Sequence, residues 1–387
     1  MKITAVTPIP VTLKSAREPM SLSFVRIETD NGLVGYGEAC DSYGATYAGV
    51  IGEIINQAFA PMLTGSELVT VEPVVERLRL STRRRLGDKG VAGQALSSIE
   101  IALWDLVARA AGRSVSAELG QVRDRVNVYA SSTFLDEGPA QFHADLLAPL
   151  LERGVRQAKV RVGPNWQQDL RTLTELRGLL PDDLELMIDG SDTFTLATAV
   201  QIAERLGGLG VRWFEEPIPQ ANRAAIAALS AKSAVPIAYG EHLYGREDAL
   251  AAFENDGISV VQPDASTTGL IESRAMAGIA TYYGARVVPH FCAGPVALAA
   301  NLALAASVRT ISVIEYPFFL EPAWTALGAA EQFGIQAIED GSLAVPSGPG
   351  LGFSLANDVA ATHPYQLPGA RVVGTVGGVL DRFAGDR

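Results

Sequence analysis

The sequence predicts an α/β fold in which a closed parallel (β/α) barrel follows an α+β segment at the N-terminus. Eight short apolar runs recur through the middle of the chain, and segments of helical periodicity lie between them. Seven of these runs are closed by a polar residue, at intervals of 23 to 30 residues. A repeat of this length is about one strand plus one helix, which is the βαβ unit. Eight such strands favour a closed barrel over an open doubly wound sheet.

The N-terminal segment has a different pattern. Apolar residues alternate with a period of two in three stretches, and residues 30–32 read Asp-Asn-Gly, which favours a hairpin turn because asparagine and glycine tolerate positive φ. From residue 45 the period becomes helical. We therefore expect an α+β unit over residues 1–122 that carries no metal-binding set of its own. Its predicted strands cover residues 3–9, 23–29 and 34–39, and its helices lie within 45–118.

The barrel is predicted over residues 123–328, and a glycine-rich, irregular segment follows over 329–387. Residues 346–352 of that segment favour a run of turns over a phosphate cradle, because no Gly-Lys-Ser/Thr ending is present. No Gly-x-Gly-x-x-Gly follows the first barrel strand, so a dinucleotide site is not supported. The predicted strands are 126–130, 157–161, 184–188, 211–214, 236–239, 258–261, 285–288 and 310–314, and the helices include 169–180, 196–206, 221–230 and 246–253.

Composition excludes several classes of protein. The 387 residues are 48% hydrophobic, which is enough for a large core, and the net charge of −12 argues against nucleic-acid binding. The basic cluster at 83–85 is interpreted as a solvated helix end. The start of the chain does not resemble a signal peptide, and residues 294–308 are too short to span a membrane, so we expect a buried helix there and a soluble, cytoplasmic protein.

Two cysteines, Cys40 and Cys292, make a disulfide framework improbable and fit a reducing compartment. Cys292 lies two residues after His290, which raises the possibility of a catalytic thiol. A buried, inert cysteine is the favoured interpretation.

Three carboxylates close consecutive predicted strands: Asp189, Glu215 and Glu241. In a barrel these strand ends are neighbours, so the carboxylates converge and repel one another unless a cation neutralises them. An all-oxygen site suits Mg²⁺, which we predict as the cofactor. Spacing does not decide between Glu215 and Glu216, but side chains alternate along a strand, so the other glutamate is expected to point toward the helix layer or a loop.

Lys159 and Arg161 are two residues apart and are predicted to face the same side of their strand. Cations beside three acids suit an anionic substrate. A lysine near another cation and a metal can have its pKa lowered enough to act as a base, whereas an arginine cannot. A solvated strand end is the alternative interpretation of this pair.

Asp264 and His290 close the next two strands. A carboxylate beside an imidazole sets its tautomer and raises its basicity, which favours a general base. A structural histidine is the alternative. His242 follows Glu241 and is expected to alternate away from the metal, unless the strand has already ended there.

Together these residues indicate removal of a proton α to a carboxylate. The dianion that results is poorly stabilised in water, and a metal with nearby cations stabilises it as charge develops. The stretches that carry the chemistry are Lys159-Val160-Arg161, Ile188-Asp189-Gly190, Phe214-Glu215-Glu216-Pro217, Gly240-Glu241, Val261-Gln262-Pro263-Asp264, Pro289-His290 and Ile314-Glu315-Tyr316.

This ordered set resembles the enolase superfamily, in the mandelate racemase subgroup, and within it the acid-sugar dehydratases. The resemblance extends over nearly the whole chain, including residues 102–106 and 348–352. It implies a modified TIM barrel, (β/α)7β, with an α+β capping domain made by residues 1–122 and completed by 329–387. Loops around 14–21 and 41–47 of the cap would then select the substrate.

The resemblance also assigns roles to residues. It makes Glu215 the metal ligand alongside Asp189 and Glu241, and it makes Asp264–His290 the base dyad. Glu315 would hydrogen-bond the substrate carboxylate or the enediolate. Racemases of the subgroup carry a Lys-x-Lys motif at the position where this chain has Lys159 and Arg161.

A guanidinium is a poor base, so we predict a dehydratase acting on a sugar acid or similar hydroxy acid, in which His290 removes the proton and a hydroxyl is eliminated. Lys159 would bind the carboxylate or act as a second acid. The alternatives are a racemase or epimerase with Lys159 as the second base, and a metal-binding barrel without turnover. We expect a small-molecule carboxylate as the ligand, no nucleic-acid or membrane partner, and a homo-oligomer. The sequence does not identify the acid.

Overall fold

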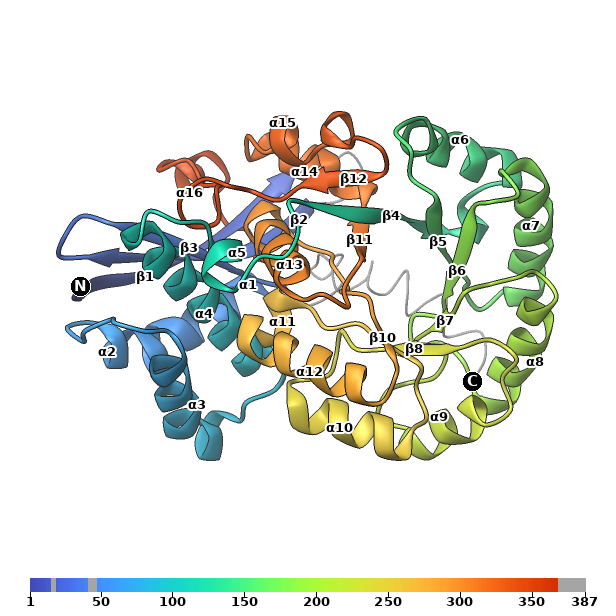
Figure 1. Ribbon diagram of the computed structural model, residues 1–387, viewed down its shortest axis with the longest axis horizontal. Helices are drawn as coiled ribbons and strands as arrows, with labels where there is room; N and C mark the ends of the chain where they lie inside the picture. Colours follow the sequence, from blue (N-terminus) through green and yellow to red (C-terminus); the bar gives the residue numbers. More distant parts are fainter. Residues whose placement is uncertain (15–18, 41–46, 368–387) are drawn as a thin grey trace.

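Eight parallel strands form the barrel wall in the computed structural model, which describes residues 1–14, 19–40 and 47–367. Their order is β10-β9-β8-β7-β6-β5-β4-β11, and each strand overlaps one predicted apolar run, so the α/β barrel is confirmed (Figure 1). The strands are β4 (Arg125–Phe134), β5 (Gln157–Arg161), β6 (Glu185–Asp189), β7 (Phe214–Glu215), β8 (Ile237–Tyr239), β9 (Val260–Val261), β10 (Arg286–Val287) and β11 (Val313–Pro317).

The wall has one weak seam, between β10 and β11. These strands do not pair as neighbours in the sheet, but the backbone N–H of Glu315 donates to the carbonyl of Pro289 at 3.2 Å. That single bond joins the two strand ends directly beside His290. The seam therefore lies within the region where the predicted site residues gather.

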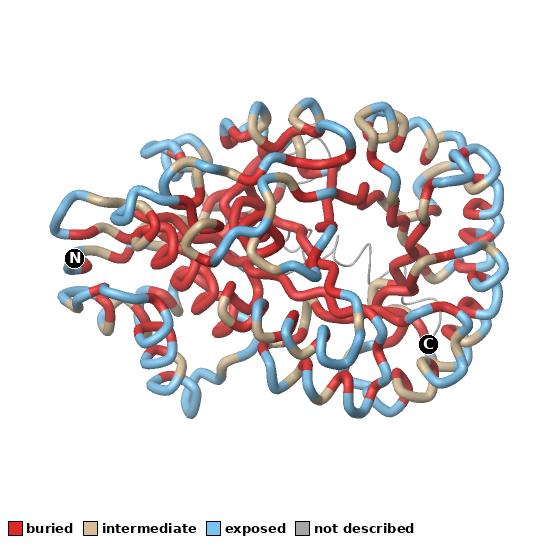
Figure 2. Tube along the Cα trace, viewed as in Figure 1, coloured by how far each residue is buried: buried red, intermediate tan, exposed pale blue. Residues whose placement is uncertain are grey.

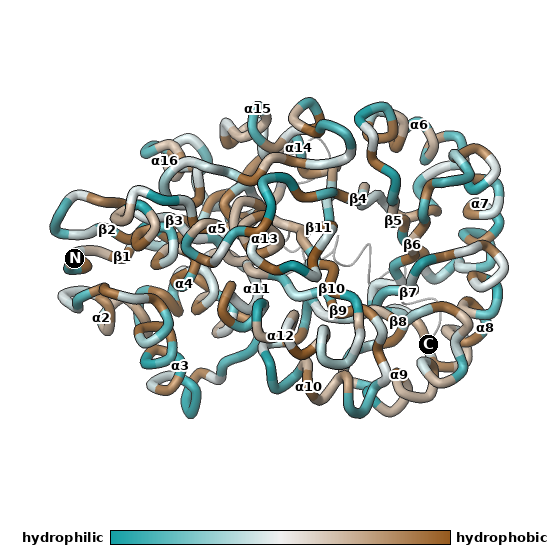
Figure 3. The backbone as a smooth tube through the Cα atoms, viewed as in Figure 1, coloured by the Kyte–Doolittle hydropathy of each residue, from teal (hydrophilic) through white to brown (hydrophobic). Residues whose placement is uncertain are grey.

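Helices cover the outside of the barrel (Figure 1). Residue colours alternate between hydrophilic and hydrophobic along the outer helices, because one face packs on the sheet and the other meets solvent (Figure 3). The helix α13 instead is buried along nearly its whole length, as predicted from its apolar sequence. The helices are α6 (Ala140–Glu152), α7 (Trp166–Leu179), α8 (Leu196–Gly207), α9 (Arg223–Ser230), α10 (Arg246–Asn255), α11 (Ala265–Thr268), α12 (Leu270–Tyr282) and α13 (Pro295–Ser307).

An antiparallel sheet and a set of helices form the N-terminal cap. The sheet order is β1-β2-β3, and β3 lies directly on α4: a Cβ added to Gly37 would come within 1.8 Å of the carbonyl of Ser98. α4 is long and apolar enough to cross a membrane, but 89% of its apolar window is buried inside the protein (Figure 2). The elements are β1 (Ile3–Lys14), β2 (Pro19–Thr29), β3 (Val34–Ala39), α1 (Ala48–Ile54), η1 (Ile55–Phe59), α2 (Ala60–Leu63), α3 (Glu72–Leu86), α4 (Gly90–Ala110) and α5 (Val115–Glu118).

The segment after β11 contacts both the barrel and the cap. β12 pairs antiparallel with β4, and the N–H of Thr12 donates to the carbonyl of His363 at 3.3 Å. The glycine-rich stretch forms turns, as predicted, with Gly350 at a φ of 74°. Its elements are η3 (Phe318–Leu320), α14 (Glu321–Ala326), α15 (Ala330–Phe333), η4 (Ile335–Ala337), β12 (Ser342–Ala344) and α16 (Val359–Thr362).

An apolar floor fills the inside of the barrel. Tyr129 is on β4, and Trp213 directly precedes β7, three strands away in the sheet order, yet their rings meet edge to face at 5.9 Å. Such a contact is possible only across the barrel interior. The floor consists of Tyr129, Met187, Trp213, Ala238, Val260, Val288 and Val313.

Candidate active site

All eight predicted site residues lie in one network of ion pairs at the C-terminal ends of the barrel strands. The two carboxylate oxygens of Glu315 link its parts, with Oε1 at 2.9 Å from Lys159 and Oε2 at 3.9 Å from His290 Nε2. The C-terminal mouth is where (β/α) barrels place their chemistry. The residues brought together are Lys159, Arg161, Asp189, Glu215, Glu241, Asp264, His290 and Glu315.

Lys159 stands on the apolar floor, with its Nζ 5.7 Å from the centre of the Tyr129 ring. It is fully buried and forms ion pairs with Glu215, Glu315 and Asp189, the last at 3.6 Å. Burial alone would lower the pKa of Lys159, but the Glu215 and Glu315 carboxylates outweigh burial and raise that pKa well above its ordinary value. Lys159 is therefore held as an ammonium ion and not as a free base.

Arg161 lies on the same side of β5, as the two-residue spacing predicts. Its Nε is 3.1 Å from Asp189 Oδ2, and its guanidinium also donates to the carbonyl of Ser132. Burial lowers the pKa of Arg161, but Asp189 and Glu315 raise it further, so the charge is permanent. We call Lys159 and Arg161, with Asp189, Glu215 and Glu315, the cation half of the site.

The dyad of Asp264 and His290 is buried next to the cation half. His290 Nδ1 is 2.9 Å from Asp264 Oδ2, and the other Asp264 oxygen accepts from Ser266 N–H at 2.7 Å and from Asn301 Nδ2 at 3.0 Å. The bond to Asp264 holds a proton on Nδ1, and Nε2, the nitrogen left for proton transfer, is paired with Glu241 in the substrate-free protein. Burial lowers the pKa of His290, but Glu241, whose Oε2 lies 2.6 Å from Nε2, and Glu315 raise it well above the ordinary value.

Glu216 lies in the site, so the expectation from strand alternation that it points to the helix layer or a loop is wrong. The strand β7 ends at Glu215, and Glu216 adopts a φ of +37°, which turns its side chain back toward the mouth. It is buried, and its Oε1 lies 3.1 Å from His242 Nδ1. Alternation ends where the strand ends.

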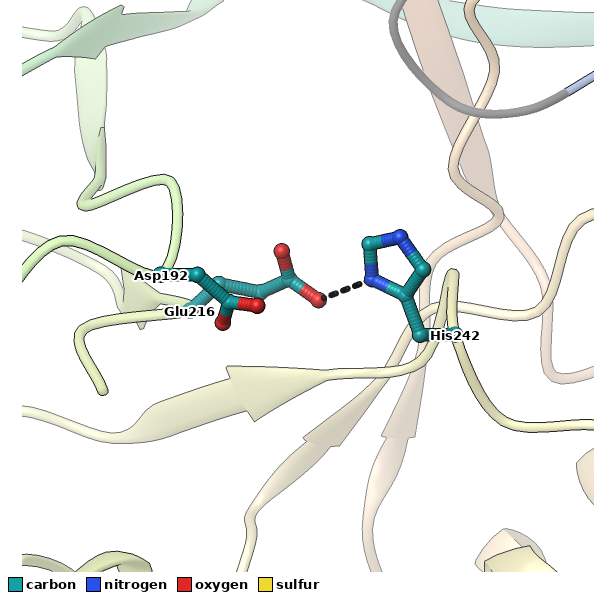
Figure 4. Close-up of side chains that lie close together, drawn as sticks. All are labelled: Asp192, Glu216 and His242. Carbon is teal, nitrogen blue, oxygen red and sulfur yellow. Dashed lines mark hydrogen bonds and ion pairs between the residues drawn. The ribbon is translucent and has the colours of Figure 1, made fainter. Parts of the chain in front are cut away.

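His242 also faces the site. The strand β8 ends at Tyr239, two residues before Glu241, so alternation no longer separates His242 from Glu241. Figure 4 shows Glu216 directed toward the imidazole, with Asp192 beside it. Ligand atoms of Asp192, Glu216 and His242 all lie within 4.8 Å of one another. We call these three residues and Glu241 the acid half of the site.

The acid half carries charge that the protein does not balance. Within residues 1–14, 19–40 and 47–367, no lysine or arginine forms an ion pair with its carboxylates, and the ion pairs of Glu216 and Glu241 are with His242 and His290. Burial raises the pKa of Asp192 to about 7, with Glu241 and Asp189 adding to the shift. Burial and the nearby Glu241 raise the pKa of Glu216 well above its ordinary value.

Several supporting residues were missed by sequence reasoning. Both oxygens of Glu215 are occupied, because Oε1 meets Lys159 and Oε2 accepts from Trp213 Nε1 at 3.1 Å and Gln262 Nε2 at 2.6 Å. Gln262 stands two residues before Asp264, and that even spacing was the available signal for it. Burial raises the pKa of Glu215 to about 7 against the effect of Lys159.

Cys292 is buried and free, and burial raises the pKa of its thiol to about 12, which supports the inert interpretation. Cys40 donates through its Sγ to the carbonyl of Cys292 at 2.8 Å. Most of the cap loops expected to select the substrate, residues 15–18 and 41–46, lie outside the described residues.

Comparison with known families identifies the chain. Residues 2–120 match the mandelate racemase/muconate lactonizing enzyme N-terminal domain, and residues 143–359 match the enolase C-terminal domain-like family. The protein is a member of the mandelate racemase subgroup of the enolase superfamily. The resemblance predicted from the motifs is therefore confirmed, and so is a modified TIM barrel with a capping domain.

Relatives within this superfamily catalyse different reactions. A D-galactarolactone cycloisomerase from Agrobacterium fabrum is 30% identical over 95% of this chain and 100% of its own length. An arabinonate dehydratase from Saccharolobus solfataricus is 28% identical over 89% and 91%, and an N-succinylamino acid racemase from an Amycolatopsis species is 27% identical over 82% and 83%. The crystal structure of the 3,6-anhydro-D-galactonate cycloisomerase from Zobellia galactanivorans superimposes with a TM-score of 0.81 at 25% identity, covering 94% of this chain and 100% of that one.

Members of the enolase superfamily bind a divalent metal, and the residues of this member fit one. Oδ1 of Asp192 is buried without a hydrogen-bond partner among the described residues. Glu216 and Glu241 are hydrogen-bonded to each other, which requires a shared proton unless a cation replaces it. A cation among these oxygens would give Asp192 Oδ1 a partner and would replace the proton shared by Glu216 and Glu241.

Proposed function

We propose that this protein is a Mg²⁺-dependent sugar-acid dehydratase. It would remove the proton α to the carboxylate and then eliminate water across the α and β carbons. The observation that carries the proposal is the asymmetry of the site. One histidine dyad, Asp264–His290, is placed to supply a base, whereas Arg161, which stands where a second lysine base would lie, is permanently charged and cannot supply another.

In the proposed reaction His290 Nε2 takes the α proton. Asp264 accepts the Nδ1–H bond at 2.9 Å and stabilises the imidazolium that forms. Ser266 and Asn301 hold Asp264 in turn. Lys159 and Arg161 would attract the substrate carboxylate and stay charged through the reaction.

Glu315 sits between these two groups. Burial would raise its pKa, but Lys159 and His290 lower the pKa to about 2, so Glu315 is a carboxylate in the substrate-free protein. A second carboxylate arriving beside it raises its pKa. Glu315 can then take up a proton and donate a hydrogen bond to the substrate carboxylate, which is the role predicted for it.

Collapse of the enediolate expels the β hydroxyl. The proton that His290 removed returns to that oxygen, so water leaves from the same face and the base is regenerated. The product is a 2-keto-3-deoxy acid after the enol becomes a ketone. Arg161 cannot serve as a second base, which disfavours two-base racemisation.

Mg²⁺ would be held among the carboxylates at the mouth, with Asp189, Glu215 and Glu241 as the predicted ligands and Asp192, Glu216 and His242 as the neighbouring set. When bound, it would supply the positive charge that stabilises the enediolate.

Opening of a sugar-acid ring is the second candidate. It breaks a β carbon–oxygen bond after the same proton removal, and it differs from dehydration only in that the leaving oxygen stays attached. A relative that matches 95% of this chain is a cycloisomerase, which favours this candidate over the racemase alternative.

The test is a screen of aldonates, aldarates and galactarolactone with MgCl₂ in D₂O. A 2-keto-3-deoxy product without deuterium in recovered substrate is the expected result. Ring opening without loss of water would replace dehydration by cycloisomerisation, and deuterium exchange alone would favour the racemase.

The variant His290→Asn should lose activity by about 10²- to 10⁴-fold. Full dehydration by that variant would remove the histidine-base assignment.

A further inference from the structure

Three buried carboxylates of the cap share an arrangement that the proposed reaction does not use. Each lies against a glycine of another segment and accepts backbone N–H groups there. The pairs are Glu38 with Gly294, Glu100 with Gly269, and Asp105 with Gly350. A Cβ at these glycines would come within 2.5, 2.3 and 2.0 Å of the carboxylate oxygens, so each glycine leaves the space that its carboxylate fills.

Two of the pairs stand directly behind the dyad. Gly294 lies four residues after His290, at the start of α13, and Glu38 accepts from the N–H of Gly294 at 2.6 Å and of Ala297 at 2.9 Å. Gly269 lies five residues after Asp264, and Glu100 accepts from the N–H of Ile271 at 2.7 Å, at the start of α12. Carboxylates suit these helix ends because the first N–H groups of a helix lack partners.

Further hydrogen bonds join the cap to the segments that carry the dyad. The Cys40 N–H donates to the carbonyl of Ser266 at 3.2 Å, and the Ser97 hydroxyl lies 2.7 Å from that carbonyl. Ser266 itself bonds Asp264. The Cys40 Sγ donates to the carbonyl of Cys292, two residues after His290.

The platform that carries these groups is rigid. Glu38 and Cys40 lie at the end of β3, Ser97 and Glu100 lie on α4, and β3 rests on α4 through Gly37 with no side chain between them. Both halves of the dyad are thus held from one surface of the cap.

We propose that Glu38 and Glu100 are positioning residues that hold Asp264 and His290 in register by fixing the starts of α12 and α13 to the cap. The inference rests on the proposed function, since it takes His290 as the base. Asp105 provides the control: it is a buried carboxylate on α4 that pairs with Arg109 at 2.9 Å, accepts from Tyr36 of β3 at 2.9 Å, and accepts from Leu351, outside the dyad segments, at 2.7 Å.

The first measurement is a comparison of kcat and KM in Mg²⁺-loaded Glu38→Ala, Glu100→Ala and Asp105→Ala, using the acid that gives most turnover in the screen. A displacement of about 1 Å at a catalytic group costs about 100-fold. We expect kcat to fall about 100-fold in Glu38→Ala and about 10-fold in Glu100→Ala, with KM within about threefold in both. Asp105→Ala should keep kcat within about threefold, even if its thermal stability falls as much as that of Glu38→Ala.

The conservative variant Glu38→Gln keeps an oxygen that can accept the Gly294 N–H. It should recover at least about tenfold of the kcat lost in Glu38→Ala, and it keeps the test decisive if Glu38→Ala does not fold. Equal loss of kcat in Glu38→Ala and Asp105→Ala would overturn the inference.

The second measurement needs no substrate. The His290 Nδ1–H bonded to Asp264 should give a downfield proton resonance in histidine-labelled protein, assigned by its absence in His290→Asn. We expect it to shift or broaden in Glu38→Ala and to be unchanged in Asp105→Ala. An unchanged resonance in Glu38→Ala would overturn the positioning role. A wild-type protein that keeps the resonance but turns over no acid would overturn the proposed function alone.

Discussion

The two halves of the active site contain similar carboxylates in opposite charge environments. In the cation half, Lys159 and Arg161 contact Asp189, Glu215 and Glu315, and the charges nearly balance within the protein. In the acid half, the ion pairs of Glu216 and Glu241 within the described residues are with histidines alone, and Asp192 has a backbone hydrogen bond with Gln220. Burial raises the pKa of Glu216 and Asp192 in the acid half and of Glu215 in the cation half, whereas Lys159 outweighs burial at Glu315 and His290 outweighs it at Glu241, so both of those pKa values are lowered.

The comparison teaches that the cation half holds fixed positive charges of its own and the acid half does not, so an added cation, whose predicted ligands Asp189, Glu215 and Glu241 come from both halves, would balance the acid half. A substrate carboxylate needs fixed positive charge, and the cation half supplies it permanently. A metal needs unneutralised oxygen ligands, and the acid half supplies those. The experiments below test this division, in order of decreasing effect.

Removal of divalent cations should abolish turnover. We expect EDTA treatment to lower kcat by at least about 10³-fold, because charge on the enediolate would lose its main stabilisation. Assays after dialysis against EDTA, with and without added MgCl₂, measure this. Full activity in the metal-free protein would show that the acid half works without a cation.

Replacing Lys159 by an uncharged residue should destabilise the cation half. In Lys159→Met the carboxylates of Glu215 and Glu315 stay buried without their partner, so we expect a loss of about 3–5 kcal/mol in unfolding free energy and of activity with it. Urea unfolding of the folded variant checks this. Lys159→Arg is the control, since it keeps the charge; an undiminished stability in Lys159→Met would argue against a balanced pair.

Neutralising one carboxylate should separate the two candidate ligand sets. Glu216→Gln removes a carboxyl whose pKa is raised by burial, so the metal-free protein should gain stability at pH 8. Calorimetric titration with Mg²⁺ should show about 10- to 100-fold weaker binding in whichever variant, Glu215→Gln or Glu216→Gln, loses a ligand. Destabilisation of metal-free protein by Glu216→Gln would contradict the charge excess.

The stability of metal-free protein should fall as pH rises from about 5 to 8. The folded-state pKa values of Asp192 and Glu215 are raised to about 7, so the folded protein binds protons that the unfolded chain has released, and this stabilisation is lost as pH passes the folded pKa. Urea midpoints at pH 5.5 and 8 in EDTA measure the effect. Added MgCl₂ should stabilise more at pH 8 than at pH 5.5, because protons compete with the cation. If Mg²⁺ stabilised the protein equally at both pH values, the cation would bind away from these carboxylates.

Strand length explains what the sequence could and could not predict in this site. β5 spans five residues, and its Lys159 and Arg161 face one side as alternation requires. β7 and β8 are two and three residues long, and Glu216 and His242 follow their ends, so alternation gave the wrong side for Glu216. Spacing located the strand ends, but it carries no information on the φ of the residue that follows.

Contacts between distant segments were beyond sequence reasoning for another reason. Glu38 meets Gly294 across 256 residues of chain, and neither residue belongs to a local pattern that names its partner. Trp213 stands in a predicted strand and Gln262 directly after one, but their bonds to Glu215 could be placed only once the barrel interior was known. The fold and the chemistry-bearing residues were therefore predictable, and their supports were not.

The apolar floor beneath Lys159 determines how molecules pass through the enzyme. Tyr129 and Trp213 meet across the barrel axis, and the other floor side chains fill the space around them, so the described part of the chain offers no rear passage. In the proposed reaction, substrate, expelled water and product would therefore share one opening at the mouth. A product that leaves slowly would keep the next substrate out, so the architecture predicts competitive product inhibition.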